Sequence, residues 1–569
     1  MPRTAPLEIE IAFKKLRPAL HRARAAAGIQ SMPFSRLLLP ALAAALVLAA
    51  GCQKRETPVE ASRHTRVLLV GNGAEPADLD PHIAVAYTDY NILVALFEGL
   101  TVIDEATSKP LPGAAERWEI SPDGLTYTFH LRADGRWSNG DPVTAGDFVF
   151  SIERILSPKL GSEYAYMLDV LKGAADYTAG KLADFTQVGA KALDARTLQL
   201  TLDRPTPYLL SLTAHQAWFP VHPASVLKFG EPHARGTGWT RPGALVGNGP
   251  FILAEWKPDQ HILVTKNPRY YATAQNRIEA VKFFPVADPG VDERAFRAGQ
   301  VHITYDVLPD RLDAWRREDP SKLRIDPVLE AFYVRFNTTR PPFNDVRVRR
   351  ALSLAIDREA IAGPVMRGSR TPARSFVPPD TAGYTSTASI PTDPAAARRL
   401  LAEAGYPEGK GFPKFEVKMN SDPVNTKVFE AIQQMWRKEL GLDCTLATMD
   451  FRVYLDAMQT LSFDVLRSRW VGDFNDPATF TDLFTSTSGN NNTGWKNPAY
   501  DRLIAAAARE LDTGRRFDLL RQAEALVLEE APATPVFFGT RTYLIHPDVK
   551  GWVPALLGVH RYQTLQIQP

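Results

Sequence analysis

An apolar run at residues 37–50, broken only by Pro40, decides in which compartment the rest of this chain folds. It follows Met32-Pro-Phe-Ser-Arg36 and ends at Gly51-Cys52. A basic start, an apolar segment of about 14 residues and small residues before a cleavage point are typical of a secretory signal. A membrane-spanning helix needs about 20 residues, so the run is too short to span comfortably. The sequence therefore predicts a signal peptide over residues 32–51.

Residues 1–31, which precede this signal, are rich in Arg and Ala and contain Glu8 and Glu10. They match no signal architecture, whereas Met32 begins a well-formed one. We therefore interpret residues 1–31 as an upstream extension and expect translation to start at Met32.

The end of the signal, Ala49-Ala50-Gly51-Cys52, resembles a bacterial lipoprotein signal. The resemblance implies that Cys52 is acylated and becomes the first residue of the mature protein. The lipoprotein pattern prefers Leu three places before the cysteine, where this chain has Ala49. The alternative interpretation is an ordinary secretory signal that happens to be followed by a cysteine. Cys444 is the other of the two cysteines, so no intrachain disulfide remains after lipidation. We predict that Cys444 is a buried structural thiol.

The charge composition argues against a nucleic-acid-binding protein. The 569 residues carry 66 Lys and Arg against 64 Asp and Glu, which leaves no basic excess for nucleic-acid binding. The first 51 residues hold seven of the basic and two of the acidic residues, so the remaining 518 have a net charge of −3. That length predicts two or three domains with ample core.

Hydrophobic patterning predicts an α/β fold. Residues 67–70 form an apolar strand, and residues 125–131 and 198–202 alternate as half-buried strands. Thr144-Ala-Gly-Asp147 has the spacing of a capping box that opens a helix. Asp393-Pro394 begins another helix, which Gly405 ends. Residues 415–446 read as strand, helix and strand, expected to be a parallel right-handed crossover.

Catalytic signatures are thin: the chain has no phosphate-binding G-x-x-x-x-G-K-[ST] loop, no G-x-S-x-G elbow and no H-E-x-x-H helix. The unusual segment is Phe463–Pro477, in which a strand-like run bearing arginines leads through a Trp into an acidic turn. Such a loop can present a carboxylate and a guanidinium to a zwitterion, with an aromatic wall between them. The alternative is a surface turn with a helix-capping Asp and a core Trp.

Five blocks of sequence follow one another between about residues 66 and 552. They are Tyr127–Arg132 with Trp137–Ser151, Asn248–Phe251 with Lys266–Tyr271, Pro342–Leu352 with Ala355–Arg358, Glu403–Pro407, and Trp470–Pro477. In these blocks and their order the chain resembles the bacterial extracellular solute-binding proteins of family 5, the receptors of peptide-type ABC importers. Within that family the likeness is greatest to oligopeptide and murein-peptide receptors.

The resemblance implies an α/β fold of the type II periplasmic-binding-protein kind, with mixed sheets, two lobes that close on ligand and an additional domain. Its boundaries on this chain are a tether at 52–65, lobe I at 66–97, 217–306 and 541–569, domain II at 98–216, and lobe III at 307–540. It implies capture of oligopeptides by hinge closure, with no enzymatic step, no cofactor and no metal.

The same resemblance implies most of the ligand site. Asp473 falls where the family binds the peptide α-ammonium, and Trp470 where it lines a side-chain pocket. Backbone groups of Val471 and Gly472 flank that position. Arg467, three residues before the Trp, falls where it can meet the peptide carboxylate.

The resemblance also implies contacts to the peptide backbone, and at two positions this chain departs from the family pattern. Tyr164, Asn492 and Thr493 fall where the family contacts peptide backbone. An Arg-His pair of the oligopeptide receptors aligns with Met458-Gln459, and a Glu of the first lobe aligns with Val85. Both departures remove polar groups, which leaves ligand length and side-chain preference open.

The implied partners are an oligopeptide, an inner-membrane permease and ATPase complex, and a membrane held through the lipid; we expect a monomer and no nucleic acid. The implied location is the periplasm, and Gln53 after the cysteine leaves either membrane open. Three alternatives stay open. They are a receptor for another solute (a nickel complex, haem, a murein peptide or a sugar), a secreted hydrolase of peptides or glycans, and a signalling or adhesion lipoprotein with a degenerate cleft.

Overall fold

The computed structural model describes residues 56–569, and residues 57–569 form one compact unit. The predicted signal peptide and Cys52 lie outside the described residues. Within residues 56–569, no helix combines the length and apolarity that crossing a membrane requires.

The first described element corrects the predicted tether at 52–65. Residues 58–65 form helix α3 (Pro58–Thr65), which a capping box opens: Thr57 Oγ1 accepts from Glu60 N at 3.2 Å, and Glu60 Oε2 accepts from Thr57 N at 2.8 Å. Val59 is buried, and its N–H donates to the Gly299 carbonyl at 3.0 Å. The segment therefore packs on the folded unit, because its cap and its one apolar side chain are both satisfied there.

A four-stranded mixed sheet follows, in the order β1-β10-β9-β8. Its strands are β1 (Val67–Gly71), β8 (Phe251–Lys257), β9 (His261–Lys266) and β10 (Ala280–Phe284). The predicted strand at 67–70 is confirmed, and it pairs with β10 in parallel. Helix α4 (Tyr87–Leu96) packs its buried face into the same core.

A second, antiparallel sheet has the order β4-β5-β7-β6 and lies between residues 115 and 201. Its strands are β4 (Ala115–Ile120), β5 (Thr126–Leu131), β6 (Ala190–Asp194) and β7 (Thr197–Thr201). Both predicted alternating strands are confirmed, since Tyr127, Phe129, Leu198 and Leu200 are buried. The predicted capping box opens helix α5 (Ala145–Leu156), with Thr144 N donating to Asp147 Oδ2 at 2.8 Å.

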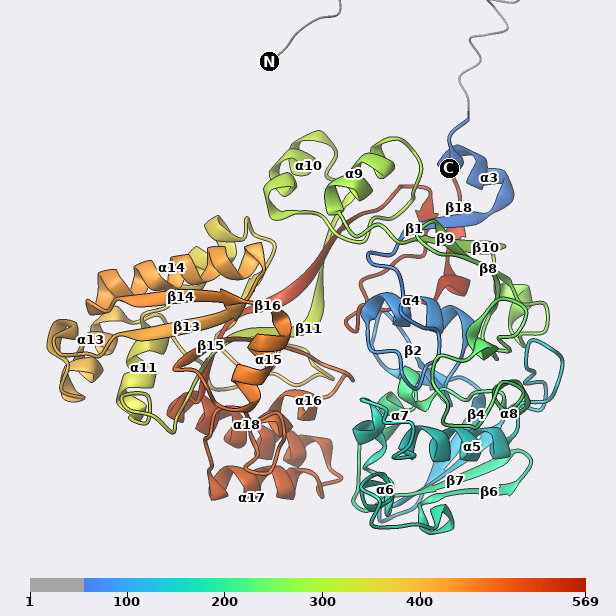
Figure 1. Ribbon diagram of the computed structural model, residues 1–569, viewed down its shortest axis with the longest axis horizontal. Coiled ribbons are helices and arrows are strands. Elements are labelled where there is room, and N and C mark those ends of the chain that lie inside the picture. The colour runs from blue at the N-terminus through green and yellow to red at the C-terminus, as the bar shows by residue number, and fades with distance from the viewer. Residues whose placement is uncertain (1–55) are drawn as a thin grey trace, which may run out of the picture. The chain divides into compact units, whose positions relative to one another are not determined.

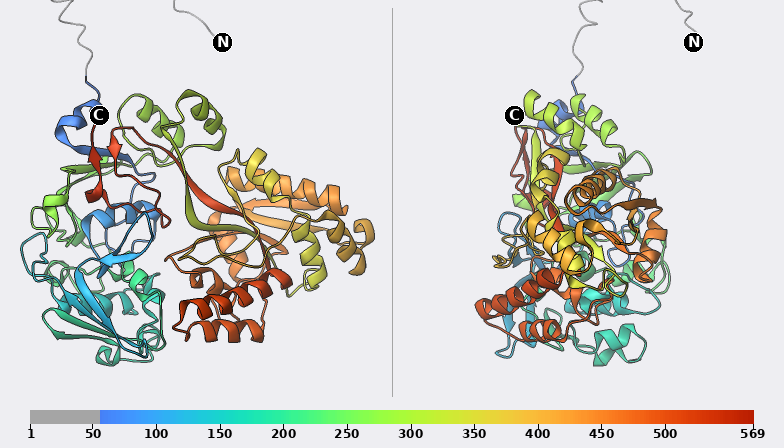
Figure 2. Two further views of the ribbon diagram at one scale, coloured as in Figure 1. Left: turned by 180° about the vertical axis from the view of Figure 1, so that it is seen from behind. Right: turned by 90° about the vertical axis from the view of Figure 1, so that its left-hand side faces the viewer.

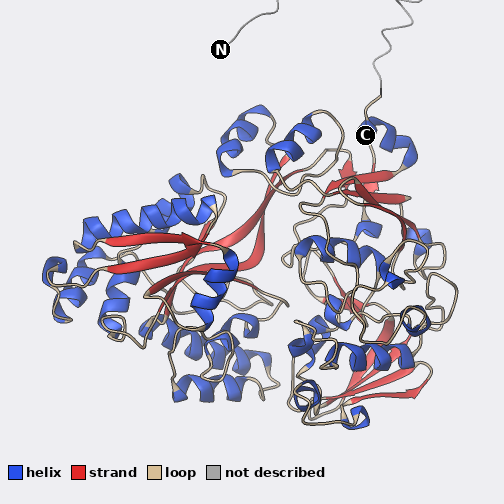
Figure 3. Cartoon of the chain, in the orientation of Figure 1, coloured by secondary structure: helices blue, strands red, loops and turns tan. Residues whose placement is uncertain are grey.

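The third sheet is mixed, with six strands in the order β12-β16-β11-β15-β13-β14. They are β11 (Leu323–Phe336), β12 (Thr371–Pro372), β13 (Phe415–Asn420), β14 (Cys444–Met449), β15 (Val465–Val471) and β16 (Ala533–Leu544). Helix α14 (Pro423–Leu440) joins β13 to β14, which pair in parallel as predicted. The neighbouring helices are α11 (Val346–Leu354), α13 (Pro394–Glu403), α15 (Phe451–Gln459), α17 (Pro498–Ala507) and α18 (Thr513–Glu530), and Figure 3 shows how they surround these strands.

Two long antiparallel strands, β11 and β16, connect the third sheet to the first. Their pairing runs from Leu323 with Leu544 at one end to Arg335 with Ala533 at the other, with an irregularity between Pro327 and Ala331. Ile303 forms bridges to β1 and to Ile545, which ties the outer end of the pair to the first sheet. Figures 1 and 2 show these two strands passing side by side beneath helices α9 (Pro289–Arg297) and α10 (Leu312–Glu318).

Candidate functional site

Asp473 follows directly after β15 and carries a carboxylate without a cationic partner. Its Oδ2 accepts a 2.8 Å hydrogen bond from the hydroxyl of Tyr166, which lies in a short 3₁₀ helix (Ala165–Leu168) far away in sequence. No Lys, Arg or His of the described residues forms an ion pair with it. Burial raises the pKa of Asp473 from 3.8 to about 6, and the Tyr166 hydrogen bond opposes this shift. The carboxylate is therefore placed to receive a positive charge.

Aromatic rings surround this carboxylate. Tyr164 packs edge-on against His215 with ring centroids 5.0 Å apart, and Tyr90 packs on the other side of His215 at 5.2 Å. Burial and the nearby charge of Asp473 raise the pKa of Tyr164 to about 12. Burial lowers the pKa of His215 to about 3, so this imidazole is neutral at physiological pH.

The structure brings Tyr166, and not Tyr164, into hydrogen-bond contact with Asp473. The resemblance placed a ligand-contacting tyrosine at Tyr164, two residues away and directly before the same short helix. Tyr164 lies close enough for the charge of Asp473 to act on it, but no hydrogen bond joins the two. A Tyr-x-Tyr pair was the available signal for Tyr166, because either ring could have faced Asp473.

One edge of β15 is largely unpaired. Strand β11 pairs with β15 over its whole length, but β13 pairs with it only at Val465 and Leu466. Gly472 N donates to the Leu329 carbonyl at 2.7 Å, so even-numbered residues of β15 direct their backbone groups toward β11. Odd-numbered residues direct theirs to the open edge, and the Tyr454 hydroxyl donates to the Arg467 carbonyl there at 2.8 Å.

Arg469 and Val471 therefore present backbone N–H and C=O groups that another extended chain can pair with. Val471, whose backbone groups were expected to flank the ligand ammonium, lies on this edge, and its contact with ligand stays a prediction. Gly472 differs, because its N–H is already bonded within the sheet.

Trp470 and Arg467 lie on opposite faces of β15, because they are three residues apart in a strand. Trp470 pairs with Ala331 and is half-buried, with its Nε1 3.4 Å from Thr479 Oγ1. Arg467 is 8% exposed, and its guanidinium lies 5.0 Å from the centroid of the Phe332 ring. Its Nε has no hydrogen-bond partner.

Thr493 and Asn492 take part in contacts within their own part of the fold. Thr493 is fully buried, its carbonyl accepts from Thr338 N at 2.9 Å, and its Oγ1 donates to Asn491 Oδ1 at 2.6 Å. Asn492 Nδ2 lies 3.3 Å from the carbonyl of Asn490. Their side chains therefore hold a loop in place, and nothing here brings them to Asp473.

Two contacts join the segment after Asp473 to residues 98–216. The Phe474 ring stacks on Tyr208 with centroids 4.6 Å apart and an interplanar angle of 9°. Asn475 Nδ2 donates to the Ser108 carbonyl at 3.3 Å. Beside them lies a pocket of about 690 Å³ whose lining residues include Ser108, Tyr208, Asn475 and Arg516.

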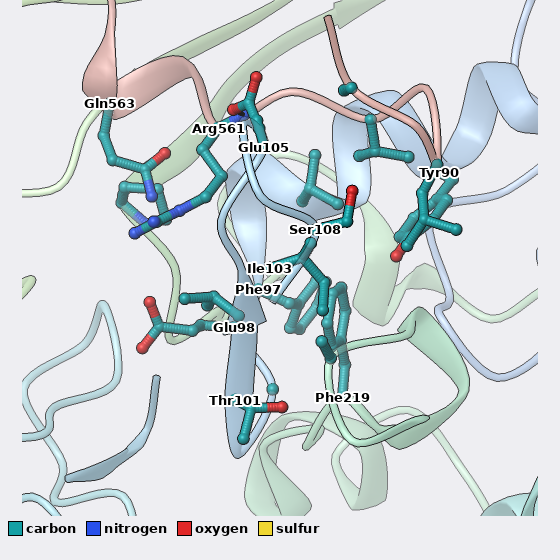
Figure 4. Close-up of a pocket in the computed structure, with 18 of the residues that line it drawn as sticks. Tyr90, Phe97, Glu98, Thr101, Ile103, Glu105, Ser108, Phe219, Arg561 and Gln563 are labelled. Atoms are coloured by element: carbon teal, nitrogen blue, oxygen red, sulfur yellow. Dashed lines mark hydrogen bonds between the residues drawn. The ribbon is translucent and has the colours of Figure 1, made fainter. Parts of the chain in front are cut away.

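A smaller pocket of about 60 Å³ lies behind Tyr90 (Figure 4). Its walls are mostly apolar and include Phe97, Ile103 and Phe219. Glu98 lies at its rim, and burial raises the pKa of Glu98 to about 7, although the Tyr270 and Tyr271 hydroxyls donate to its carboxylate. A volume of this size holds a few water molecules.

Cys444 is buried, as predicted, and burial raises the pKa of its thiol to about 12. A thiol with so high a pKa is a poor nucleophile. Within residues 56–569, no cluster of three or more His, Cys, Asp or Glu side chains could hold a metal ion.

The chain is similar to several known proteins along almost its whole length. A family model described as "Bacterial extracellular solute-binding proteins, family 5 Middle" matches residues 109–492. The periplasmic oligopeptide-binding protein OppA of Salmonella typhimurium is 34% identical over 531 residues, which cover 91% of this chain and 95% of that protein. The probable deoxycholate-binding periplasmic protein YgiS of Escherichia coli is 35% identical over 524 residues, which cover 91% of this chain and 95% of that protein.

Among solved structures, the Escherichia coli murein tripeptide binding protein MppA superposes with a TM-score of 0.76 at 35% identity. The match covers 88% of this chain and 98% of that one. These likenesses confirm the predicted α/β fold with mixed sheets.

Proposed function

The chain belongs to the family 5 bacterial extracellular solute-binding proteins, and from that premise we propose that it captures oligopeptides for an ABC importer without changing them chemically. One observation carries the proposal: the half-buried carboxylate of Asp473, which pairs with no cation of residues 56–569, stands just beyond a strand whose edge is open. A peptide has an α-ammonium for the carboxylate and a backbone for the edge.

The open edge of β15 supports binding of an extended peptide as an added strand. Main-chain hydrogen bonds to Arg469 and Val471 give affinity that does not depend on the peptide's side chains. Such pairing suits a receptor for peptides of varied sequence, with water filling the remaining contacts in its side-chain pockets.

Arg467 is the proposed partner of the peptide carboxylate. It precedes Asp473 by six residues, which is about 20 Å along an extended strand. Its side chain shortens that span, yet a separation of this order suits a short peptide better than a single amino acid. An ammonium and a carboxylate bound at the two ends are each stabilised more strongly once closure excludes water.

We propose that β11 and β16 are the hinge on which the lobes close. They are the long strands that join the third sheet to the first, and their pairing is irregular between Pro327 and Ala331. The proposed lobes are residues 66–97, 217–306 and 541–569 on one side and 307–540 on the other, with 98–216 as the additional domain. Ligand selects the closed state through the contacts that only this state offers.

We further propose a periplasmic location with a lipid anchor at Cys52, and capture as a monomer. The periplasmic name of the oligopeptide-binding relative supports the location. The anchor rests on the residues before Cys52, and the permease and ATPase partners follow from the proposed role.

A lipophilic ligand of the kind named for the deoxycholate-binding relative is a second candidate, and the geometry favours it less. The apolar pocket lined by Tyr90 has about 60 Å³, whereas pockets for drug-sized molecules have about 300–1,000 Å³. The pocket of about 690 Å³ reaches that size, but polar side chains such as Asn475 and Arg516 line it. A murein peptide, another of the expected alternatives, is a variant of the same proposal, and the name of the murein tripeptide binding relative supports it.

Native mass spectrometry of the protein as purified tests the proposal. We expect a co-purified population of peptides, released unchanged on denaturation and replaceable by added peptide. Recovery of a non-peptide solute that added peptides fail to displace would contradict the proposal, and so would cleavage of the added peptides.

A further inference from the structure

Three arginines gather on one face of the third sheet, at the end of β15 that carries the open edge. Arg467 and Arg469 project from the same face of β15, since they pair with Val334 and Phe332 of β11. Arg370 comes from the residue before β12, almost 100 positions earlier, and its Nη1 lies 3.0 Å from Thr540 Oγ1 of β16.

Two stacked phenylalanines support this group. The rings of Phe332 and Phe537 lie 4.5 Å apart at an interplanar angle of 17°. The Arg467 guanidinium lies 5.0 Å from the Phe332 centroid, and that of Arg370 lies 5.9 Å from the Phe537 centroid. The two cations therefore stand over neighbouring rings of one apolar platform.

The carboxylates nearby do not neutralise the three cations. Glu330 Oε2 lies 3.9 Å from Arg469 Nη1, the one ion pair within the group. Asp306 accepts from Thr542 Oγ1 at 2.8 Å, and both Arg370 and Arg541, which lies on the same strand as Thr542, act on its charge.

Asp422 also acts on Arg370, but it caps helix α14, whose Val424 N–H donates to it at 2.7 Å. A carboxylate at a helix N-terminus is already stabilised by the helix. With Arg541 included, four guanidinium groups face the carboxylates of Glu330, Asp306 and Asp422, which leaves a local charge of about +1.

Buried arginines of this chain are compensated in two ways: Arg349 and Arg358 donate to backbone carbonyls, and two others pair with carboxylates. Arg154 holds Asp80 through two nitrogens at 2.9 and 2.6 Å, and Arg516 holds Asp476 at 2.9 and 2.6 Å. Arg467 is as deeply placed, at 8% exposed, but has no carboxylate partner among the described residues, and its Nε has no hydrogen-bond partner. Burial and the charge of Arg469 lower the pKa of both Arg370 and Arg467. An uncompensated buried cation is costly unless a bound anion completes it.

We propose that Arg370, Arg467 and Arg469 form a site for two ligand carboxylates, so that the receptor prefers peptides with an acidic side chain at the C-terminal residue. The inference rests on the proposed function, in which Arg467 receives the peptide carboxylate. A second carboxylate, from a Glu or Asp side chain, gives Arg469 a closer partner than Glu330, whose carboxylate oxygen lies 3.9 Å away. The exposed guanidinium of Arg469, 51% accessible, is the group of the three that a ligand side chain can reach most directly.

Calorimetry on the purified, ligand-stripped protein tests this with matched peptides. The pairs are Ala-Ala-Glu and Ala-Ala-Gln, Ala-Ala-Ala-Glu and Ala-Ala-Ala-Gln, and the corresponding Lys peptides. We expect the Glu peptide of at least one length to bind about tenfold more tightly than its Gln isostere, and the Lys peptide to bind most weakly. In Arg469→Gln the ratio between Glu and Gln peptides falls to about threefold or less.

Arg452→Gln is the matched control, because Arg452 is an exposed arginine of the nearby helix α15. It should keep the full preference for Glu. Arg370→Gln is expected to reduce the preference for Glu peptides as Arg469→Gln does. If loss of the Arg370 hydrogen bonds disturbs folding, the test rests on Arg469→Gln alone.

Equal affinity for Glu and Gln peptides in the native protein would overturn the inference and leave peptide capture intact. So would a preference that Arg469→Gln and Arg452→Gln preserve alike. Binding of none of these peptides would instead overturn the proposed function on which the inference rests.

Discussion

The Tyr166 hydroxyl donates a 2.8 Å hydrogen bond to Asp473 Oδ2 across 307 positions of sequence. The bond joins a segment of residues 98–216 to the loop that leaves β15. It supports the ionised carboxylate against burial, which favours the neutral acid. We therefore expect the charge of Asp473 to affect peptide affinity, the pH dependence of binding and the stability of the protein.

Removing the charge of Asp473 should abolish discrimination between free and blocked peptide amines. We expect Asp473→Ala and Asp473→Asn to weaken binding of free-amine peptides by at least about 2 kcal/mol, because each strands the ammonium of a buried pair. Calorimetry with a peptide and its N-acetylated form provides the measurement. The native protein should strongly prefer the free amine, and both variants should not; equal affinity for the two forms in the native protein would refute the role of Asp473.

Binding should weaken in acid. The pKa of Asp473 is about 6 in the ligand-free protein, so its carboxylate is mostly ionised at pH 7 and mostly protonated at pH 5. Only the ionised form attracts the α-ammonium, which keeps its proton over this range. We expect affinity for a free-amine peptide to fall about tenfold between pH 7 and pH 5. Titrations at several pH values check this, and an affinity that stays constant down to pH 5 would contradict it.

The same carboxylate should cost stability when no ligand is bound. Its folded-state pKa is raised from 3.8 to about 6, so the stabilising protonated form is fully present below about pH 4 and is lost as pH rises through 6. Asp473→Asn should therefore raise the free energy of unfolding at pH 7 by about 1–2 kcal/mol and leave it nearly unchanged at pH 4. Denaturant titrations at both pH values measure the difference. A variant less stable than the native protein at pH 7 would show that the carboxylate is already compensated.

Local sequence signals predicted the elements around this site well. The capping box at Thr144 and Asp147, the alternation along residues 125–131 and the strand–helix–strand unit at 415–446 are each determined by neighbours within a few residues. The strand-like run predicted within Phe463–Pro477 is β15 in the structure. In these places the tertiary fold keeps what local propensity prefers.

Contacts between segments that lie far apart in the sequence could not be predicted from these local signals. Whether Tyr164 or Tyr166 faces Asp473 depends on how a four-residue 3₁₀ helix is oriented, and both positions carry the same side chain. Arg370 joins Arg467 only because β12 adds to the far edge of β16. Helix α3 was predicted as tether, because it has one buried apolar residue, Val59, and so lacks the periodic pattern that marks a helix.

Tyr166→Phe should weaken capture of free-amine peptides by about 1 kcal/mol, roughly fivefold, because the carboxylate loses its hydrogen-bond donor. Loss of that donor also raises the pKa of Asp473 further, so the acid fall in affinity should begin at a higher pH. Tyr177→Phe is the matched control, since Tyr177 packs on Phe185 within residues 98–216 and its hydroxyl makes no hydrogen bond to Asp473. Affinity and pH profile should both stay near native in the control. Identical behaviour of the two variants would show that the Tyr166 hydroxyl does not set the charge of Asp473.

The stack of Tyr208 on Phe474 joins residues 98–216 to the loop that carries Asp473, and it should contribute to closure. Such a pair gains about 0.5–1.5 kcal/mol beyond the area it buries, and lobe separation would break it. We expect Tyr208→Ala to weaken peptide binding by about three- to tenfold. Tyr177→Ala is the control, because Tyr177 packs on Phe185 within residues 98–216 at a centroid distance of 5.3 Å. The control should lower the melting temperature and leave affinity unchanged. If both variants weaken binding equally, the effect comes from stability of residues 98–216 rather than from closure.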